Sequence, residues 1–208
     1  MNEPPDSPTE PVHVWLTTTG EDPRATAHRL VEQLAASLGH PAPLHHTATG
    51  QPTVDGLHVS LTHTTGVAAV AATRLGPVGI DAELRRDLPV SAMARRWFAP
   101  AEHTDDPETF LKLWTAKEAV GKALGRGLRG SGLSRKMPAD LLTSSNQMPL
   151  IAQVVPTERE LAVVHIPGDV VLAVAFPAVA RELVLHHGTA LRSTVRSRTS
   201  FPVVVRGI

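Results

Sequence analysis

The sequence feature that most constrains the fold is a pattern of helix-capping residues that occurs twice. Asp22-Pro23 opens an amphipathic segment that ends at Gly39, and Asp106-Pro107 opens a second one that ends at Gly125. An Asp N-cap followed by Pro at the first helical position, with Gly after the last turn, marks both ends of a helix. Each helix is followed by two alternating, β-branched runs, which predict a hairpin. The chain is therefore expected to contain two similar α+β units.

The two units are expected to pack face to face as an internal pseudo-dimer, which gives an α+β fold class. The pattern returns after roughly ninety to a hundred residues, a period that is too long for a solenoid repeat. A cleft between two packed units is a natural place for a ligand, so we expect the active site at their interface. The alternative is that a common helix-hairpin motif occurs twice by chance.

Hydrophobic periodicity and turn residues predict the remaining elements. The expected strands span residues 12–18, 57–63, 66–74, 79–84, 160–165 and 170–176. A further helix is expected at 89–98 and a short turn at 100–102, whereas residues 126–150 are expected to be rich in loops. The predicted division is a flexible tail at 1–11, an N-terminal half at 12–88, a C-terminal half at 89–176 and a basic tail at 177–208.

The composition excludes several function classes. The formal net charge is zero at pH 7, so no overall field attracts nucleic acid or a membrane surface. The sequence has no Cys, which excludes disulfides, thiolate nucleophiles and Cys-type zinc sites. Its first residues are acidic and rich in Pro, unlike a signal peptide, and no apolar run approaches the roughly 20 residues of a membrane span. We therefore expect a cytoplasmic protein that binds neither nucleic acid nor membranes.

A pair of carboxylates on one predicted strand is the first candidate site. Asp81 and Glu83 are two residues apart, so on a strand they face the same side at about 6.6 Å. At about 7 Å and an effective dielectric constant of about 20, two such charges repel by about 2.4 kcal/mol. A divalent cation would offset this repulsion, because hard cations bind carboxylate oxygens. The alternative is an ordinary solvated strand face, because Asp-x-Glu is a weak motif on its own.

The second predicted helix, within residues 110–128, carries two unusual residues. Lys117 falls within its apolar stripe, where a cation is rare. Gly121 lies in mid-helix, where Gly costs about 1 kcal/mol relative to Ala, so we expect another backbone or a ligand to approach it closely. Glu118 and Lys122 form an i, i+4 pair beside the stripe. The alternative is an ordinary helix-stabilising pair and a lysine that extends to solvent.

Two further groups are candidates for contacts with phosphate or with an acidic partner. Thr62 and His63 lie at the bend of the first predicted hairpin, where a hydroxyl and an imidazole can donate to phosphate oxygens. A plain polar turn is the alternative. The stretch between Glu118 and Asp140 contains no acid. Its basic residues predict a docking surface for an acidic partner, and they are Lys122, Arg126, Arg129, Arg135 and Lys136.

These residues occur in an order that resembles a known family. The matching motifs are Gly50-Gln51-Pro52, Ser60-Leu61-Thr62-His63-Thr64, Gly79-Ile80-Asp81-Ala82-Glu83, Trp97-Phe98 with Glu102, Trp114-Thr115-Ala116-Lys117-Glu118-Ala119 with Lys122, and Gly125-Arg126-Gly127-Leu128. The sequence resembles the 4′-phosphopantetheinyl transferases of the surfactin-synthetase-activating (Sfp) type. The likeness covers residues 29–128 and extends through the second hairpin to about residue 176. The order and spacing of Gly-Ile-Asp-x-Glu and Trp-x-x-Lys-Glu-Ala-x-x-Lys are its most specific part.

The resemblance implies a pseudo-dimeric α+β fold with the active site between the halves. It implies an enzyme of secondary metabolism that transfers the phosphopantetheine arm of coenzyme A to a Ser of an acyl or peptidyl carrier protein. Mg²⁺ would assist, and adenosine 3′,5′-bisphosphate would leave. The acidic carrier would dock on the basic residues from Arg126 to Lys136. A monomer is expected, because a pseudo-dimer has less need of a partner.

The same resemblance implies a role for each candidate residue. The implied Mg²⁺ ligands are Asp81, Glu83 and Glu118. Glu102, or Glu118 through a water, would take the proton from the carrier Ser. Lys117 and Lys122 would neutralise charge that develops on the pyrophosphate. The implied contacts with coenzyme A are Arg29, Gln51, Pro52, Thr62, His63, Asp81, Lys117 and Lys122.

Three features depart from the family pattern. Gln51 occupies a position where the family has Lys or Arg, and the segment before the first helix has Arg24 in place of paired lysines. The tail after Glu182 has no family role and would be a disordered arm or a source of phosphate contacts; its arginines are Arg192, Arg196, Arg198 and Arg206. We expect weaker coenzyme A binding rather than loss of chemistry. The alternative is a family-like protein without this activity, which binds coenzyme A or catalyses another reaction.

Overall fold

The structure, a computed structural model, describes residues 10–129, 132–142, 149–187 and 197–207. Its α-helices are α1 (Pro23–Ser37), α2 (Val90–Trp97) and α3 (Pro107–Ala123), and its 3₁₀ helices are η1 (Pro100–Glu102), η2 (Gly132–Ser134) and η3 (Ala139–Leu141). Its strands are β1 (Val12–Thr18), β2 (His45–His46), β3 (Pro52–Thr53), β4 (His58–Thr64), β5 (Val67–Thr73), β6 (Gly79–Leu84), β7 (Leu150–Val155), β8 (Glu158–Ile166), β9 (Val170–Pro177), β10 (Glu182–His187) and β11 (Ser197–Arg206). None of the described helices combines the length and the apolarity needed to cross a membrane.

The local capping signals place both long helices as expected. The side chains of Asp22 and Asp106 accept backbone N–H groups in the first turns of α1 and α3, at 3.0 and 2.8 Å. Gly39 and Gly125 follow the helix ends with φ of 83° and 66°, a conformation that glycine adopts without strain. The predicted strands are also confirmed, as β1, β4, β5, β6, β8 and β9, and so are α2 and the turn at η1.

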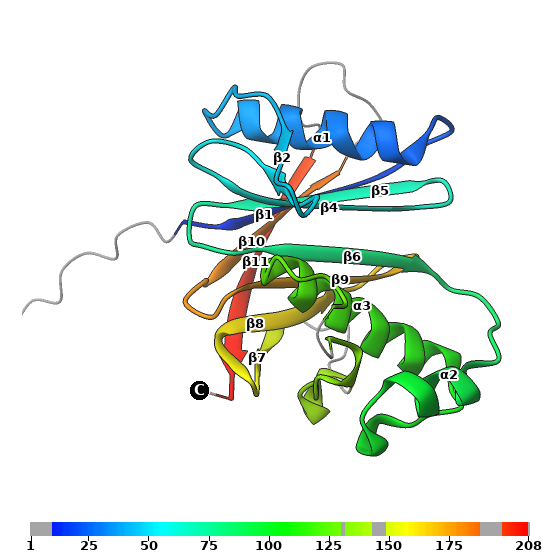
Figure 1. The fold of residues 1–208 in the computed structure, drawn as a ribbon. Helices are drawn as coiled ribbons and strands as arrows, with labels where there is room; N and C mark the ends of the chain where they lie inside the picture. The colour runs from blue at the N-terminus through cyan, green and yellow to red at the C-terminus, as the bar shows by residue number, and fades with distance from the viewer. Residues whose placement is uncertain (1–9, 130–131, 143–148, 188–196, 208) are drawn as a thin grey trace, which may run out of the picture.

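One nine-stranded sheet joins most of the described strands, in the order β4-β5-β1-β10-β11-β7-β8-β9-β6, and β2 and β3 form a separate two-stranded sheet. Neighbours in the large sheet are antiparallel, except for the parallel pairs β1–β10 and β11–β7. The sheet curls until its two end strands, β4 and β6, lie side by side (Figure 1). Side chains of β4 bridge this seam: Ser60 accepts from the backbone N–H of Ile80 at 3.1 Å, and Thr62 donates to Asp81 at 3.0 Å.

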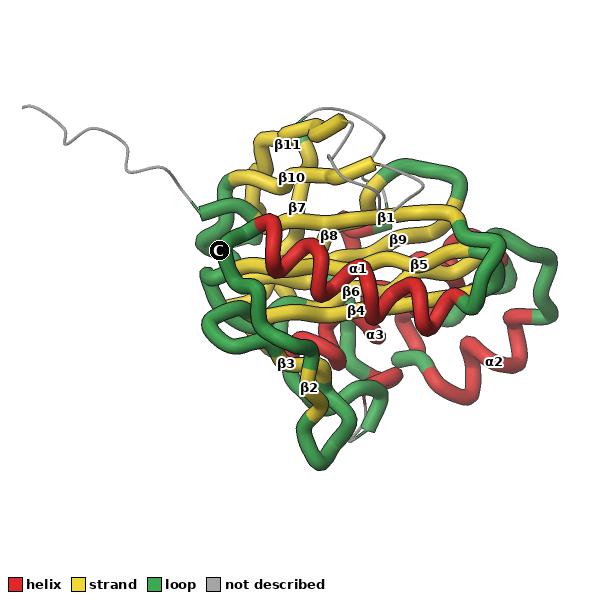
Figure 2. The backbone as a smooth tube through the Cα atoms, turned by 90° about the horizontal axis from the view of Figure 1, so that it is seen from above, coloured by secondary structure: helices red, strands yellow, loops and turns green. Residues whose placement is uncertain are grey.

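Each predicted helix-hairpin unit is present, and each long helix covers its own strands. The helix α1 packs on β4 and β5, whereas α3 packs on β6, β8 and β9. The two helices lie on opposite sides of the curled sheet in Figure 1, and Figure 2 shows α1 lying across the strands of the first unit. Leu30 and Leu34 of α1 and Phe110 and Leu113 of α3 are buried against these strands. The mixed α+β class is thus confirmed, whereas the pseudo-dimeric relation of the halves stays a prediction.

The segment expected to be a basic tail is a correction to the sequence analysis. Residues 182–187 and 197–206 form β10 and β11, which lie in the middle of the sheet and join β1 of the first unit to β7 of the second. The strands β2, β3 and β7 were not predicted either. Residues 1–9 of the expected N-terminal tail, together with Arg192 and Arg196, lie outside the described residues. Strand β6, expected in the N-terminal half, pairs with β9 of the C-terminal half.

Gly121 is approached closely by another backbone, as expected from its position in mid-helix. The backbone N–H groups of Arg126 and Gly127 both donate to the carbonyl of Gly121, at 3.0 and 2.9 Å. A Cβ atom at residue 121 would lie 2.1 Å from the carbonyl oxygen of Gly127. The partner is thus the turn that follows the helix, which folds back and forms one wall of the pocket described below.

We therefore expect Gly121→Ala to destabilise the protein strongly, by at least about 2 kcal/mol, because backbone atoms must move to admit the methyl group. The free energy of unfolding, measured by urea denaturation, tests this. Gly168→Ala is the matched control, since a Cβ atom there meets nothing within 4 Å. Equal stability of the two variants would contradict the packing described here.

Candidate active site

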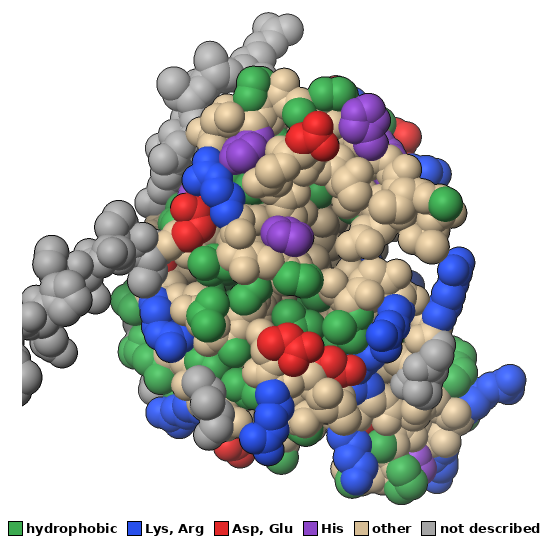
Figure 3. Space-filling view, turned by 60° about the vertical axis from the view of Figure 1, so that its left-hand side comes forward, with side chains coloured by type: hydrophobic (Ala, Val, Ile, Leu, Met, Phe, Trp, Pro, Cys, Tyr) green, Lys and Arg blue, Asp and Glu red, His purple; other side chains and the backbone are tan. Residues whose placement is uncertain are grey.

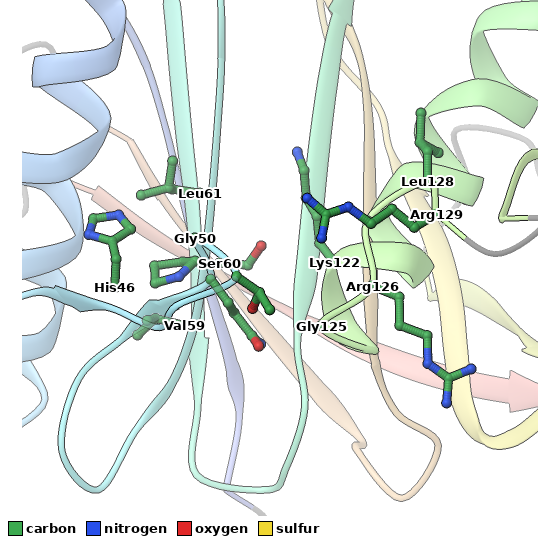
Figure 4. A pocket seen from close by; sticks show the side chains of 14 residues that line it. His46, Gly50, Val59, Ser60, Leu61, Lys122, Gly125, Arg126, Leu128 and Arg129 are labelled. Carbon is green, nitrogen blue, oxygen red and sulfur yellow. The ribbon is translucent and has the colours of Figure 1, made fainter.

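A pocket of about 300 Å³ lies between the first hairpin and the C-terminal end of α3. Figure 4 shows His46 and Leu61 on one wall and Lys122, Arg126 and Arg129 on the other. The expected contacts Gln51 and Pro52 also line it. Because three cations share one wall, the pocket favours an anionic ligand.

A buried carboxylate connects three elements at the edge of this pocket. Asp81 of β6 is 3% exposed. Its Oδ1 atom accepts from the Thr62 hydroxyl of β4 at 3.0 Å and from the Lys122 ammonium of α3 at 2.7 Å. Lys122 also donates to the carbonyl of Ile80 at 3.0 Å. The other oxygen, Oδ2, is buried and accepts no hydrogen bond from any described residue.

Two further carboxylates, Glu83 and Glu118, lie close to Asp81, and both have raised pKa values. Burial, followed by repulsion from Asp81, raises the pKa of Glu83. Glu118 is affected more strongly: burial and then the Asp81 charge raise its pKa to about 7, although Lys122 acts in the opposite direction. Glu83 also forms an ion pair with Arg86 at 3.6 Å. The structure thus brings together Asp81, Glu83, Glu118 and Lys122, as the sequence predicted.

The carboxylates fit a cation in their chemistry but not yet in their arrangement. The unpartnered Oδ2 atom of Asp81 and the raised pKa values of Glu83 and Glu118 indicate negative charge that its neighbours compensate incompletely. No three His, Cys, Asp or Glu side chains within the described ranges are arranged to hold a metal ion, however. Lys122 is the cation in contact with Asp81 here. A metal ion would therefore require these side chains to rearrange.

Lys117 and Glu102 form a separate, buried pair on another face of α3. The Lys117 side chain is fully buried, and its ammonium lies 2.7 Å from Glu102 and 4.9 Å from the centroid of the Phe98 ring. It also donates to the backbone carbonyl of Arg135. The other oxygen of Glu102 accepts from the backbone N–H of Met137 at 2.6 Å. Burial lowers the pKa of Lys117, and the Glu102 carboxylate opposes that shift. In this structure the pair anchors residues 135–137 and does not line the pocket.

The basic stretch after α3 does not form one surface. Arg126 and Arg129 line the pocket and Lys136 is exposed, but the Arg135 side chain is only 8% exposed and pairs with Glu158 at 3.3 Å. Arg135 is thus a correction to the predicted docking surface. On the face drawn in Figure 3, most Lys and Arg side chains gather over the half that carries α2 and α3, and histidines gather over the half that carries α1.

The residues that were expected to contact the nucleotide differ in their exposure and in their partners. Arg29 pairs with Glu21 and donates to the Thr26 hydroxyl at 3.2 Å, so its guanidinium is engaged within α1 and the turn before it. Gln51 packs against Gly125: its Oε1 atom is 2.7 Å from the position of a Cβ at that glycine. His63 is exposed at the end of β4.

The sequence analysis missed two histidines, His28 and His46, that lie near these residues. Their ring centroids are 5.2 Å apart. The available signal was the His45-His46 pair, of which only one member lines the pocket. Because His28 and His46 are on different elements, only the fold could bring them together.

Comparison with known proteins relates part of this chain to a family. Residues 77–175 match the model of the 4'-phosphopantetheinyl transferase superfamily. The resemblance stated from the motifs is thus confirmed for the segment that contains Asp81, Glu83, Glu118 and Lys122. The Sfp subtype stays a prediction.

Two curated relatives each match part of the chain. One is named "Putative 4'-phosphopantetheinyl transferase slr0495", from Synechocystis, and is 29% identical over 99 residues that cover 43% of this chain and 40% of that protein. The other is named 4'-phosphopantetheinyl transferase HetI, from Nostoc, and is 30% identical over 127 residues that cover 54% of this chain and 53% of that protein. The chain thus spans about half the length of these relatives, or less.

Glu102→Gln should destabilise the protein by about 3 kcal/mol, because it leaves the Lys117 ammonium buried without its counter-charge. The amide oxygen of Gln can still accept from Met137, so the test isolates the charge. Urea denaturation measures the effect. The control is Glu108→Gln, which removes the partner of an exposed ion pair with Arg85 and should cost less than about 1 kcal/mol. Similar losses for both variants would show that the buried charge is not what matters.

Glu118→Gln should stabilise the ligand-free protein at pH 8 but not at pH 5. The pKa of Glu118 rises from 4.5 to about 7 on folding, so its favourable protonation is complete below pH 4.5 and is lost as the pH rises through 7. Gln has no proton to lose. In buffer without divalent cations, the melting temperature of the variant should exceed that of the parent by several degrees at pH 8 and by little at pH 5. The exposed Glu160→Gln is the control, and a difference that is independent of pH would refute the shift.

Proposed function

We propose that the protein transfers the 4′-phosphopantetheine arm of coenzyme A to a Ser of an acyl or peptidyl carrier protein. The observation that carries the proposal is the cluster of Asp81, Glu83, Glu118 and Lys122 beside a pocket with a cationic wall. The superfamily match covers all four of these residues. In this reaction the Ser oxygen bonds to the phosphorus that carries the pantetheine, and adenosine 3′,5′-bisphosphate leaves.

The cationic wall would bind the pyrophosphate of coenzyme A. Lys122, Arg126 and Arg129 line the pocket from one side. Their positive charges would stabilise the negative charge that develops on the leaving group. The ammonium of Lys122 already touches a carboxylate at 2.7 Å, which fixes its position before a ligand arrives. Lys117, in contrast, is fully buried in its own ion pair and would act by holding the segment after α3 in place.

Asp81, Glu83 and Glu118 would hold Mg²⁺ once their side chains have moved. When bound, the ion would supply electrophilic stabilisation of the pyrophosphate. The Lys122 ammonium would then move from Asp81 to the phosphate oxygens. The metal ion would replace it as the positive charge next to Asp81. In the protein without ligand, Lys122 and the Thr62 hydroxyl are the groups that stabilise the buried Asp81 carboxylate.

Of the two candidate bases, Glu118 is favoured over Glu102. Both oxygens of Glu102 are engaged, one by Lys117 and the other by the backbone N–H of Met137. Glu118 lies with Asp81 and Lys122 beside the pocket. It would take the Ser proton directly or through a water, as general-base catalysis requires a carboxylate within hydrogen-bond reach.

The site would lie between two related halves, and the carrier would dock at its mouth. The seam between β4 and β6 runs past Asp81, so the pocket has walls from both helix-hairpin units. Arg126 and Arg129 at the pocket and the exposed Lys136 would attract an acidic carrier. Arg135 is excluded from this role by its burial. We infer a monomer, because both units occur in one chain.

The proposal is tested by incubating the protein with apo carrier protein, coenzyme A and Mg²⁺, followed by mass spectrometry of the carrier. The carrier should gain the mass of one phosphopantetheine. Glu118→Gln should reduce turnover at least about 100-fold, because it removes the carboxylate that would take the Ser proton. Circular dichroism should show that the fold is intact. Glu160→Gln, an exposed acid away from the pocket, should retain full turnover.

The failing outcomes separate the alternatives. If several apo carriers gain no mass, the transfer proposal is wrong. Protection of the protein by coenzyme A against thermal unfolding would then indicate a family-like protein that binds the nucleotide without this transfer. The neutral Gln51 and the engaged Arg29 are the observations that favour this second candidate.

A further inference from the structure

The hydroxyl of Thr62 has a partner that the resemblance to the transferases does not imply. That resemblance makes Thr62 a contact with coenzyme A. In the structure its side chain is 5% exposed, and its hydroxyl donates to Oδ1 of Asp81 at 3.0 Å. A threonine hydroxyl has a single proton, and a carboxylate only accepts hydrogen bonds. While this bond lasts, Thr62 therefore has no proton to donate to a phosphate oxygen.

The strand β4 directs Thr62 toward β6. Side chains alternate along a strand, so Ser60 and Thr62 share a face that Leu61 does not. Ser60 accepts from the backbone N–H of Ile80, and Thr62 donates to the next residue of β6, Asp81. Among the described residues, Ser60 and Leu61 line the pocket and Thr62 does not. Two hydroxyls of β4 thus reach β6, and that of Thr62 is the one that contacts the carboxylate.

The contacts of Asp81 determine how its carboxylate is oriented. The terminal torsion of an Asp side chain is broad, so the rotamer alone does not fix the direction of the two oxygens. Thr62 and Lys122 both donate to Oδ1, at 3.0 and 2.7 Å. The Oδ2 atom is buried and accepts no hydrogen bond from the described residues. Because both donors hold Oδ1, Oδ2 is the oxygen that remains for a ligand.

The two donors differ in how firmly the protein holds them. Thr62 is β-branched, which restricts its rotamers, and it lies in a strand that is paired with β5. Lys122 reaches Asp81 through a long side chain that is 28% exposed. In the proposed function, the Lys122 ammonium moves to the phosphate oxygens of the ligand. Thr62 is then the donor that stays on the carboxylate.

We propose that Thr62 is a positioning residue for Asp81 during transfer and is not a contact with coenzyme A. Its hydroxyl holds Oδ1 while Lys122 is engaged by the ligand, and this keeps Oδ2 available to the reacting groups. The inference rests on the proposed function, because it assigns Thr62 a part in that reaction. Loss of the hydroxyl should therefore slow the transfer and leave the affinity for the nucleotide unchanged.

The experiment compares Thr62→Val, which keeps the shape of the side chain without a donor, with Thr62→Ser, which keeps the hydroxyl. Modification of apo carrier protein in the presence of Mg²⁺ is measured at several concentrations of coenzyme A, so that kcat and KM are obtained separately. Thr62→Val should lower kcat at least about tenfold, because a small misplacement of a reacting group is costly. Its KM for coenzyme A should change by less than about twofold. Thr62→Ser should keep kcat within about threefold of the parent, because it can still donate to Asp81.

A binding measurement separates positioning from contact without turnover. The probe is adenosine 3′,5′-bisphosphate, titrated by calorimetry in buffer without divalent cations. Thr62→Val should bind it with the affinity of the parent, within about twofold, because the hydroxyl already donates to Asp81. If Thr62 donated to a phosphate instead, loss of that bond to a charged group would weaken binding about tenfold or more.

Thr73→Val is the matched control for the loss of a buried threonine hydroxyl. Thr73 is fully buried on β5, and its hydroxyl donates to the backbone carbonyl of Pro11 at 3.2 Å, away from the pocket lining. Its replacement should leave kcat within about twofold of the parent, because it shares no partner with Asp81. Circular dichroism establishes that each variant is folded at the assay temperature. If valine is not accommodated at residue 62, Thr62→Ala gives the same test.

The outcomes distinguish this inference from the proposed function. The inference would be overturned by a kcat of Thr62→Val close to that of the parent, by an equal loss in Thr62→Ser or Thr73→Val, or by weaker binding of adenosine 3′,5′-bisphosphate to Thr62→Val. In each of these cases the parent still modifies the carrier, so the transfer proposal stands. Absence of carrier modification by the parent itself would overturn both.

Discussion

The contact between Lys122 and Asp81 is the interaction on which the arrangement of the site depends. It joins α3 to β6, and the Thr62 hydroxyl joins the same carboxylate to β4, so one buried charge holds three elements from both helix-hairpin units. A carboxylate as buried as Asp81 is tolerated only because donors reach it. Those donors exist because the sheet curls until its end strands meet. The pocket, its cationic wall and the group of carboxylates all lie at this junction.

Two glycines permit the close packing that makes this contact possible. A Cβ atom at Gly79 would lie 1.9 Å from the carbonyl oxygen of Ala119, so only glycine allows α3 to lie so near β6. Gly121 admits the turn that carries the pocket-lining arginines in the same way. On another face of α3, the buried pair of Lys117 and Glu102 anchors the chain beyond that turn. One face of α3 thus carries an ion pair that protein covers, and another face carries Lys122, which lines the pocket.

The sequence was sufficient for elements with strong local signals and for residues within short motifs. The Asp-Pro caps predicted both long helices, and the resemblance to the transferase family implied that Asp81, Glu83, Glu118 and Lys122 lie together. Arg135 was misplaced, because a charge count along the chain cannot show that Glu158 of a distant strand accepts one of those charges. The pairing of His28 with His46 was missed for a similar reason, since it depends on how a loop returns to α1. The strands β10 and β11 were missed because few turn signals separate them from a basic segment.

The position of β10 and β11 bears on how this protein can fold. Strands from late in the sequence lie between β1 and β7, so β1 finds its parallel partner only after most of the chain is available. The two hairpins can form early from local contacts, but the sheet that unites them requires pairings between residues as distant as Val12 and Leu183. Such non-local pairing is slow and leaves strand edges open in the meantime. The junction around Asp81 can therefore assemble later than the two units that supply its residues.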